Sequence, residues 1–508
     1  MLNKQTCGRI LRLFVVLAFT LSVLLGLSAV QAASYTIVND TFWKDTSGNP
    51  IYSQGGGIFK FNGTYYWYGV KYNGAVTYYN NPTAKNSDTS FNAVTCYSST
   101  DLVNWKFENN ILTASTPGLE GCTWLGRLGV AYNTTTKKYV LVTQFVGNNG
   151  SGILFATSSA PTGNYTYNRV QTSITNVVNG MSGDQTIFTD DDGKSYLVFS
   201  NTSGRAYTYV APLRTSDYLN VEPATQIYHS TSGGREGNCM FKYNGRYYVC
   251  SSDLHGWNAS QCYYISSTSI LGSYSSEGVM TNSDKDFCHV SQTGFFVTVS
   301  GTSGTTVLFC GDRWCDFAGN GAGYNQWCPV TFSGTTPIFN SYSNWNLDAA
   351  AGTWSVAGGN NYVLNPTFEA DRVSQNALAG WSTWDNLSSA DPNSNDSDHY
   401  GSGRWCMAQS YTSAYSASRY QNVTGLPNGT YTLKAWVKSS GGQGVCRMFV
   451  KNYGGSELQS SFNTAISNWT QITISNINVT NGQCQIGIYQ EANANNWCRA
   501  DGFTLTRN

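Results

Sequence analysis

The sequence predicts an all-β protein in which a five-bladed β-propeller precedes a β-sandwich. Three observations support this prediction. Strand–turn–strand segments recur five times between residues 54 and 314, long helical stretches rich in Ala, Glu, Lys and Leu are missing, and apolar and polar residues alternate from Tyr362 onward. A single β-sandwich with long insertions would not explain five matching units.

The five repeats share an apolar strand, a polar turn that contains Gly or Asn, and a second apolar strand. The segment "REGNCMFKYNGRYYVCSS" is one example, and the five turns fall near residues 63, 134, 192, 245 and 302. Four of the units carry a further strand and turn, such as "TCYSSTDLVNW". About four strands per repeat are typical of a propeller blade.

The chain divides into three predicted parts: a signal peptide at residues 1–32, the propeller at residues 34–357 and the sandwich at residues 361–508. Basic residues precede an apolar run at 13–27, and "SAVQA" supplies the small residues of a cleavage site near Ala32. The run is short for a helix that spans a bilayer. We therefore expect a secreted protein with no membrane contact.

The charge and cysteine content bear on partners and compartment. With 11% charged residues and a net charge of zero, the chain lacks the basic stripe of a nucleic-acid-binding protein. We also expect a monomer. Thirteen of the fourteen Cys follow the signal peptide, which predicts disulfides in an oxidising compartment. Cys239 and Cys250 flank the Asn244–Gly245 turn symmetrically and are expected to face each other across a hairpin.

The residues just ahead of each hairpin are the candidates for a shared pocket, because the first strand of each blade lines the central axis of a propeller. These residues are Gln54, Arg127, Asp184, Glu236 and Gln292. Trp124 and Trp257 lie close to the same strand ends, where they would either stack on a sugar ring or pack between blades.

Glu236 and Asp184, from neighbouring repeats, are expected to face each other in this pocket. Two carboxyl groups across a sugar-sized channel are typical of glycoside hydrolysis. One must stay protonated to act as the acid, and a nearby carboxylate raises its pKa. Glu236 suits the acid and Asp184 the modulator. The alternative is that Glu236 forms a structural ion pair with Arg235 or another basic group.

A set of motifs that runs in order through the whole propeller resembles glycoside hydrolase family 43, and most of all its exo-β-1,3-galactanase branch. The motifs are "WKDTSGNPIYSQGGGIFKFNGTYYWYG", "CYSSTDLVNW", "SGDQTIFTDDDGKSYLVFS", "GREGNCMFK", "SDLHGW", "SQTGFF" and "GDRW". The resemblance implies an inverting exo-hydrolase of polysaccharide that needs no cofactor for catalysis. It also implies that Glu236 is the general acid and that Asp184 tunes and orients it.

Two departures from the family pattern leave alternatives open. Most of the family has an Asp base where this chain has Gln54. The galactanase branch also lacks that Asp. At the position of Gln292, this branch has a Gln that is linked to the attacking water. Gly126 stands where that branch has a Glu that contacts the sugar, although Arg127 is kept. The substrate alternatives are therefore a β-galactofuranoside or an α-L-arabinofuranoside, and the functional alternative is a non-catalytic lectin.

The C-terminal part contains the motifs "LNPTFE" and "ADGFTL". Through these motifs it resembles carbohydrate-binding modules of the β-jelly-roll kind. This resemblance implies a structural calcium held by Glu369 and Asp501. We expect the module to tether the enzyme to a polymer through exposed aromatic side chains. The aromatic candidates are Trp381, Trp405 and Trp497, together with Trp384, Tyr411 and Tyr415, whereas Trp436 is expected in the core.

Overall fold

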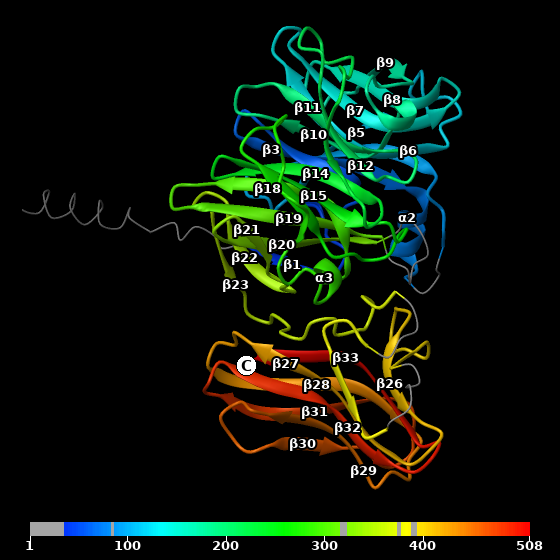
Figure 1. The fold of residues 1–508 in the computed structure, drawn as a ribbon, viewed down its shortest axis with the longest axis vertical. Coiled ribbons are helices and arrows are strands. Elements are labelled where there is room, and N and C mark those ends of the chain that lie inside the picture. Colours follow the sequence, from blue (N-terminus) through cyan, green and yellow to red (C-terminus); the bar gives the residue numbers. More distant parts are fainter. Residues whose placement is uncertain (1–34, 83–85, 315–322, 373–376, 388–393) are drawn as a thin grey trace, which may run out of the picture.

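The computed structural model describes residues 35–82, 86–314, 323–372, 377–387 and 394–508. The predicted signal peptide lies outside these residues. Within the described ranges, no helix has the length and apolar character needed to cross a bilayer. The chain forms two units, of which the N-terminal one occupies the upper part of Figure 1 and the C-terminal one the lower part.

The N-terminal unit contains five four-stranded antiparallel sheets, each built from consecutive strands. The first comprises β2 (Gln54–Phe61), β3 (Thr64–Tyr72), β4 (Phe91–Ser99) and β5 (Lys106–Thr113). The second comprises β6 (Trp124–Asn133), β7 (Lys138–Gly147), β8 (Gly150–Ser158) and β9 (Thr166–Gln171). The third comprises β10 (Ser182–Thr189), β11 (Ser195–Asn201), β12 (Tyr207–Pro212) and β13 (Thr225–His229). The fourth comprises β14 (Arg235–Tyr243), β15 (Arg246–Asp253), β16 (Tyr263–Ser267) and β17 (Gly278–Val279). The fifth comprises β18 (Gln292–Ser300), β19 (Thr305–Arg313), β20 (Tyr324–Ser333) and β21 (Thr336–Phe339).

The first strands of the five sheets contact one another in a closed cycle, from β2 through β6, β10, β14 and β18 back to β2. The five sheets are therefore the blades of a β-propeller, as the repeats predict. In the part of the propeller that the structure describes, three short helical segments interrupt the strands: α2 (Asn73–Asn80), η1 (Val178–Gly180) and α3 (Phe287–Val290).

A small sheet joins the two ends of the propeller chain. In it β1 (Tyr35–Val38) pairs with β22 (Asn344–Asp348), which pairs with β23 (Thr353–Val356). Beside it, Trp67 of the first blade and Trp327 of the fifth are fully buried, with ring centroids 4.9 Å apart. Burial of such large aromatic surfaces stabilises the closure of the ring.

The C-terminal unit is a β-sandwich of two five-stranded antiparallel sheets. One sheet consists of β24 (Ser382–Asp385), β27 (Tyr415–Thr424), β32 (Gln483–Ala492), β29 (Val445–Lys451) and β30 (Leu458–Ser461). The other consists of β25 (Asn395–Asp396), β26 (Cys406–Ser410), β33 (Trp497–Arg507), β28 (Gly429–Ser439) and β31 (Ile466–Val479).

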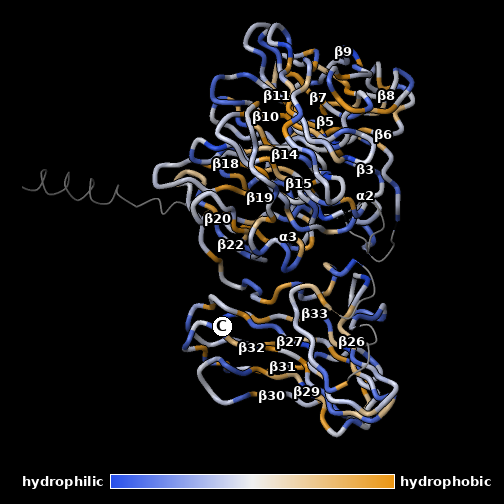
Figure 2. The backbone as a smooth tube through the Cα atoms, viewed as in Figure 1, coloured by the Kyte–Doolittle hydropathy of each residue, from blue (hydrophilic) through white to orange (hydrophobic). Residues whose placement is uncertain are grey.

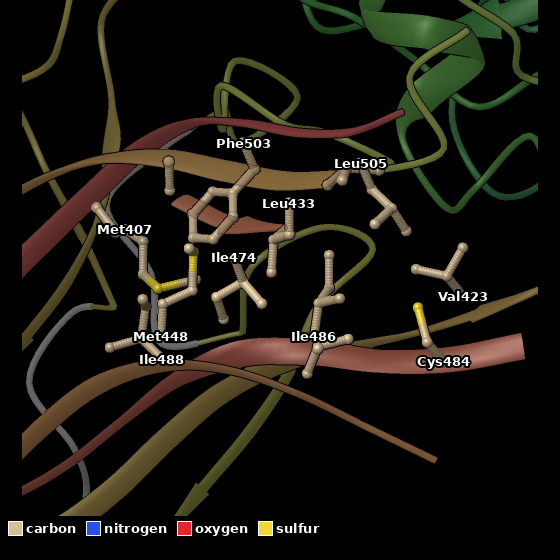
Figure 3. Close-up of a cluster of buried hydrophobic side chains, with 14 of the residues drawn as sticks. Met407, Val423, Leu433, Met448, Ile474, Cys484, Ile486, Ile488, Phe503 and Leu505 are labelled. Carbon is tan, nitrogen blue, oxygen red and sulfur yellow. The ribbon is translucent and has the colours of Figure 1, made fainter. Parts of the chain in front are cut away.

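Apolar side chains from both sheets of the sandwich fill the space between them (Figure 3). Leu433 and Leu505 come from one sheet, and Met448 and Ile486 come from the other. In Figure 2 many apolar stretches lie within strands, whereas the loops at the edges are mostly polar. Buried and more exposed residues alternate along β28, as the pleat of a strand requires.

Cysteine pairing differs from the expectation. Cys239 and Cys250 lie directly opposite each other in the β14–β15 ladder, as predicted. Their side chains are nevertheless not joined, and the Cys239 thiol is directed to the Cys250 carbonyl at 3.7 Å. All twelve cysteines in the described ranges are free, and eleven of them are buried.

Candidate active site

A β-bulge near the inner end of each first strand positions the site residues. The pairing shifts between Glu236 and Cys239 in β14, and similar shifts occur in β2, β6, β10 and β18. Gly237 in the β14 bulge has φ +63°, and a Cβ atom there would lie 2.3 Å from the Thr293 carbonyl oxygen. Only glycine fits this position, and bulges of this kind redirect side chains next to active sites.

The five bulges surround a pocket of 280 Å³ at one end of the propeller axis. A volume at the lower limit of ordinary ligand sites, about 300 Å³, suits a ligand of about one sugar ring. The lining residues are Gly55, Tyr72, Trp124, Arg127, Asp184, Arg205, Glu236, Gly256, Trp257, Gln292 and Trp314. The structure therefore brings six of the predicted residues together here: Trp124, Arg127, Asp184, Glu236, Trp257 and Gln292. Gln54 is a correction, because its amide is buried beside the pocket and donates to the Gly323 carbonyl at 2.8 Å.

Asp184 is held as a carboxylate by three donors. Its Oδ2 accepts from Arg127 Nε and from the Gly237 N–H, both at 2.9 Å, and its Oδ1 lies 2.9 Å from Arg205 Nη1. Burial alone would raise the pKa of Asp184, but the two guanidinium groups and the N–H group together bring that pKa below its ordinary value. Asp184 is therefore ionised at neutral pH and cannot serve as the acid.

Glu236 behaves in the opposite way. Burial first, and then the charge of Asp184, raise the pKa of Glu236 from 4.5 to about 7. Its Oε1 accepts from Gln292 Nε2 at 2.6 Å and its Oε2 accepts from Arg205 Nη1 at 3.0 Å. A carboxyl group with this pKa carries a proton at neutral pH for an appreciable fraction of the time, as a general acid requires.

Arg205 was not predicted, although it is the cation that connects the two carboxyl groups. It lies in the turn after β11 with φ +47°, a left-handed conformation that is rare for Arg. The comparison of the first strands of the five repeats could not identify Arg205, because this residue lies in a loop. The expected alternative, an ion pair of Glu236 with Arg235 or another basic group, is met by Arg205, whose Nη1 lies 3.0 Å from Glu236 Oε2. Arg235 is not the partner, because neighbouring residues of a strand point to opposite faces and Arg235 pairs with Glu277.

Arg127 connects the pocket to a second unpredicted residue, Asp312. Arg127 Nη1 donates to Asp312 Oδ2 at 3.3 Å, and Asp312 Oδ1 accepts from the Gly55 N–H at 3.2 Å. Burial raises the pKa of Asp312, an effect that Arg127 opposes. Asp312 lies on the second strand of its blade, and its only sequence signal is the motif "GDRW".

Gln292 is oriented by all four of its hydrogen bonds. Its Oε1 accepts from Arg127 Nη2 at 2.8 Å and from Trp314 Nε1 at 2.9 Å, and both partners can only donate. Its Nε2 donates to Glu236 and, at 3.2 Å, to the Gly256 carbonyl. No atom of the amide is left to bind an attacking water in this conformation, so the structure assigns Gln292 to holding Glu236.

Aromatic side chains form one wall of the pocket. Trp124 stacks on Tyr72 with ring centroids 5.7 Å apart, and Trp257 lies against Trp314 at 4.9 Å. The Trp124 indole also occupies the space beside Gly126, where a Cβ atom would lie 2.6 Å from Trp124 Nε1. The aromatic ring thus takes the place of any side chain at position 126.

The aromatic candidates of the sandwich are distributed differently from the expectation. Trp381 is 7% exposed and packs in the core against Phe503, so it cannot be a platform for sugar. Tyr411 and Tyr415 are also buried. Trp405 and Trp497 are only partly exposed, beneath Arg404 and Arg499 respectively. Trp436, expected in the core, stacks on the exposed Tyr400 on the outer face of its sheet.

Trp384 is the most exposed large apolar side chain among the described residues, at 47%. It lines a groove of 410 Å³ on the outer face of its sheet. The other lining residues are Ser418, Tyr420, Arg447, Phe449, Lys451, Glu457, Gln485 and Tyr489.

Glu369 and Asp501 lie close together, as the C-terminal motifs predict. Burial first, and then the charge of Glu369, raise the pKa of Asp501 well above its ordinary value. Backbone N–H groups of Arg404 and Trp405 donate to Glu369 Oε1, and that of Tyr400 donates to Asp501 Oδ2. Two buried carboxyl groups that repel each other suit a hard cation. The described residues contain no cluster of three or more His, Cys, Asp and Glu for a metal, so other ligands would be backbone oxygens or water.

Comparison with known proteins agrees with this geometry. Residues 69–317 match the family model for glycosyl hydrolases family 43. An arabinoxylan arabinofuranohydrolase from Bacillus subtilis (strain 168) is 28% identical over 262 residues, which are 46% of this chain and 49% of that protein. The chain therefore spans about half the length of this curated relative.

Two solved structures extend the comparison. A family 43 β-1,3-galactosidase with galactodeoxynojirimycin is 25% identical, with a TM-score of 0.50 over 60% of this chain and 98% of that one. An exo-β-1,3-galactanase from Clostridium thermocellum has the same fold, with 24% identity and a TM-score of 0.56 over 93% of this chain and 100% of that one. The propeller of this chain, with Glu236 and the ionised Asp184 in one pocket, is thus similar in sequence and fold to the glycosyl hydrolases of family 43.

Proposed function

We propose that the protein is a secreted, exo-acting, inverting hydrolase that removes one terminal sugar at a time, namely galactose from β-1,3-galactan and arabinogalactan-type polysaccharide. The observation that carries this proposal is the contrast between the two carboxyl groups of the pocket. Glu236 has a pKa of about 7, whereas the pKa of Asp184 is lowered. The pair can therefore supply one proton donor and one fixed negative charge.

In the proposed reaction, the Glu236 carboxyl group gives its proton to the glycosidic oxygen as the bond to the terminal sugar breaks. The carboxylate that forms is stabilised by Arg205 at 3.0 Å and by the Gln292 amide at 2.6 Å. Both donors are in place before the reaction, so no reorganisation is needed when the charge appears. Asp184 keeps Arg205 and Arg127 in position through its two ion pairs.

Inversion follows from the engagement of Asp184. A retaining enzyme needs a second carboxylate that is free to attack the anomeric carbon. Asp184 accepts hydrogen bonds from Arg127 Nε and from the Gly237 N–H group, and it forms an ion pair with Arg205. These contacts hold its carboxylate beside Arg127. Direct attack by water therefore fits this pocket better than a covalent intermediate. The water oxygen bonds to the anomeric carbon as the bond to the leaving oxygen breaks, the proton of that water passes to solvent, and the configuration is inverted.

Galactose is the proposed terminal sugar because the solved neighbours are described as β-1,3-galactosidases and exo-β-1,3-galactanases. The small pocket suits a single sugar ring at the end of a chain rather than an internal segment. The runner-up is a furanose, either a β-galactofuranoside or an α-L-arabinofuranoside. Gly126 and the Trp124 ring beside it favour this alternative, as does the arabinofuranohydrolase relative.

Product analysis tests this proposal. The wild type and Glu236→Gln are incubated with β-1,3-galactan, arabinogalactan, galactofuranosides and arabinofuranosides, and the released sugars are identified by chromatography. We expect free galactose from the first two polymers with the wild type and none with the variant. Release of arabinose or galactofuranose alone would support the furanose alternative. A polymer that binds but is never cleaved would identify a lectin.

For the sandwich we propose a polysaccharide-binding role centred on the Trp384 groove. Tyr420 and Phe449 flank Gly487 on neighbouring strands, and Tyr420 packs so closely over Gly487 that a Cβ atom there would lie 2.8 Å from Tyr420 Cβ. Trp384 stands at one side and Arg447 at the other, along one row of cross-strand neighbours. Aromatic faces with polar groups at the edges match the apolar faces and hydroxyl groups of a sugar.

Affinity electrophoresis on galactan and arabinogalactan tests the groove. Trp384→Ala is expected to lose retention, whereas Tyr400→Ala, which removes an exposed aromatic ring from the opposite sheet, is expected to keep it. Loss of retention in Tyr400→Ala alone would move the site to the opposite face.

We also propose that Glu369 and Asp501 hold a structural calcium ion, which would balance their two charges.

A further inference from the structure

Arg372, near the start of the sandwich unit, reaches back to the blade that carries Glu236. Its Nη1 and Nη2 donate to Oδ2 and Oδ1 of Asp253, each at 3.0 Å, and its Nε donates to the Ala259 carbonyl at 2.8 Å. The Arg372 side chain is 14% exposed and that of Asp253 is 17% exposed. A two-pronged guanidinium–carboxylate pair with little solvent access fixes the position of both groups.

Small residues allow the two units to approach closely around this pair. Ala370 packs with Ala259 and Val290 of the propeller, and Ala379 lies against the same cluster. Figure 1 shows α3 on the side of the propeller that faces the sandwich. The Arg372 guanidinium also lies over the Phe287 ring of α3, 4.5 Å from its centroid. The contact therefore combines an ion pair with apolar packing.

The segment that Arg372 holds is a wall of the active site. Asp253 is the last residue of β15 and Ala259 lies in the connection from β15 to β16; residues 253–260 are here called the 253–260 loop. Gly256 and Trp257 of this loop line the pocket. The Gly256 carbonyl accepts from Gln292 Nε2, the same group that donates to Glu236 Oε1. A displacement of the loop would thus act on both the aromatic wall and the acid.

The second contact of the sandwich is with α3, which leads directly into Gln292. All four residues of α3 are in the left-handed region, with φ between +49° and +56°. The left-handed conformation is unfavourable for L-amino acids, so such a turn persists only where its surroundings hold it. Asp286 accepts from the His289 N–H on one side, and the sandwich packs on Phe287 and Val290 on the other.

We propose that the sandwich completes the active site through Arg372, a positioning residue that holds the 253–260 loop against the pocket. Through Asp253 it fixes Trp257 in the aromatic wall, and through Gly256 it fixes the Gln292 amide that orients Glu236. The sandwich is then part of the catalytic structure as well as a tether to polymer. The kinetic part of this inference rests on the proposed function, while the placement of the loop does not.

The test compares Arg372→Ala, Arg372→Lys and the control Arg507→Ala in the full chain. Arg507 is an exposed residue of the same unit that pairs with β28 and donates to the Asn428 carbonyl. Two quantities are measured: kcat and KM on β-1,3-galactobiose, a soluble substrate that needs no tether, and hydrogen–deuterium exchange of residues 253–260.

We expect Arg372→Ala to lower kcat/KM by about tenfold to a hundredfold, the usual cost of a catalytic group displaced by about 1 Å. KM is expected to rise as well, because Trp257 moves, whereas a variant that merely unfolds in part would lose kcat at unchanged KM. Exchange in the 253–260 loop should increase. Arg372→Lys, which keeps one contact, should be intermediate, and added guanidinium ion should partly restore Arg372→Ala.

Wild-type values of KM, kcat/KM and loop exchange in Arg372→Ala would overturn the inference. So would a defect that is confined to polymeric substrates, since that would assign Arg372 to tethering alone. If the wild type releases no sugar from galactobiose, the galactosidase proposal fails. Loop exchange then still decides the role of Arg372 by itself.

Discussion

Replacing Glu236 by Gln is expected to remove a pH-dependent loss of stability from the propeller. The pKa of Glu236 is 4.5 in an exposed carboxyl group and about 7 in the folded protein, mainly because the group is buried. Between these two pH values the folded protein keeps the proton and the unfolded chain releases it. The free energy of unfolding therefore falls as pH rises through this window, and the contribution is fully lost above pH 7.

The magnitude follows from the two pKa values. At about 1.4 kcal/mol per pH unit, the interval from 4.5 to 7 corresponds to about 3 kcal/mol. Gln has nearly the same shape and no charge at any pH. Compared with wild type, Glu236→Gln should therefore gain about 3 kcal/mol of relative stability between pH 4.5 and pH 8.

Urea unfolding followed by tryptophan fluorescence measures this difference at several pH values. Asp184→Asn is the contrasting variant: the pKa of Asp184 is lowered, so its stabilisation is present above its ordinary pKa and is lost only in more acidic solution. This variant should be less stable than wild type at pH 5, and the deficit should shrink toward pH 8, because removing the Asp184 charge also lowers the pKa of Glu236 and so reduces the stability that Glu236 costs on ionisation. Parallel pH profiles for wild type and Glu236→Gln would show that Glu236 titrates as an ordinary carboxylate, and the acid assignment would be refuted.

Three further predictions concern the pocket and the sandwich. Asp184→Asn should move the basic limb of the kcat/KM profile to lower pH, because it removes a charge that raises the pKa of Glu236; a limb that stays in place would contradict this role. Gly126→Ala should raise KM severalfold with little change in kcat, since the new Cβ atom displaces Trp124, and an unchanged KM would contradict the aromatic wall. Calcium should raise the melting temperature of wild type and EDTA should lower it, while Glu369→Gln should respond to neither; equal responses would exclude this calcium site.

The site residues that could be predicted from sequence are those on the first strand of each blade. Asp184, Glu236 and Gln292 lie at similar distances before their turns, and propeller geometry brings such positions together. Arg205 and Asp312 lie on a loop and on a second strand, which follow no common spacing. Their contribution depends on how neighbouring blades pack, and a local pattern carries no information about that contact.

In the sandwich, the prediction that Trp436 lies in the core was wrong, although the alternation of the strand indicates its true position. In β28, Leu433, Ala435 and Val437 face the core, so a period of two places Trp436 on the outer face, as the structure confirms. Trp381 and Trp384 are three positions apart and therefore point in opposite directions. Their sequence alone does not reveal which of the two faces inward, because that depends on the packing of Trp381 against Phe503.

The central claim is that Glu236 is the acid of an inverting exo-hydrolase. Proton NMR of β-1,3-galactan during the first minutes of hydrolysis tests it most directly, since the anomer that appears first precedes mutarotation. The account predicts that the wild type releases α-galactose first and that Glu236→Gln releases none. Release of the β anomer first, or release by the variant at the wild-type rate, would contradict it.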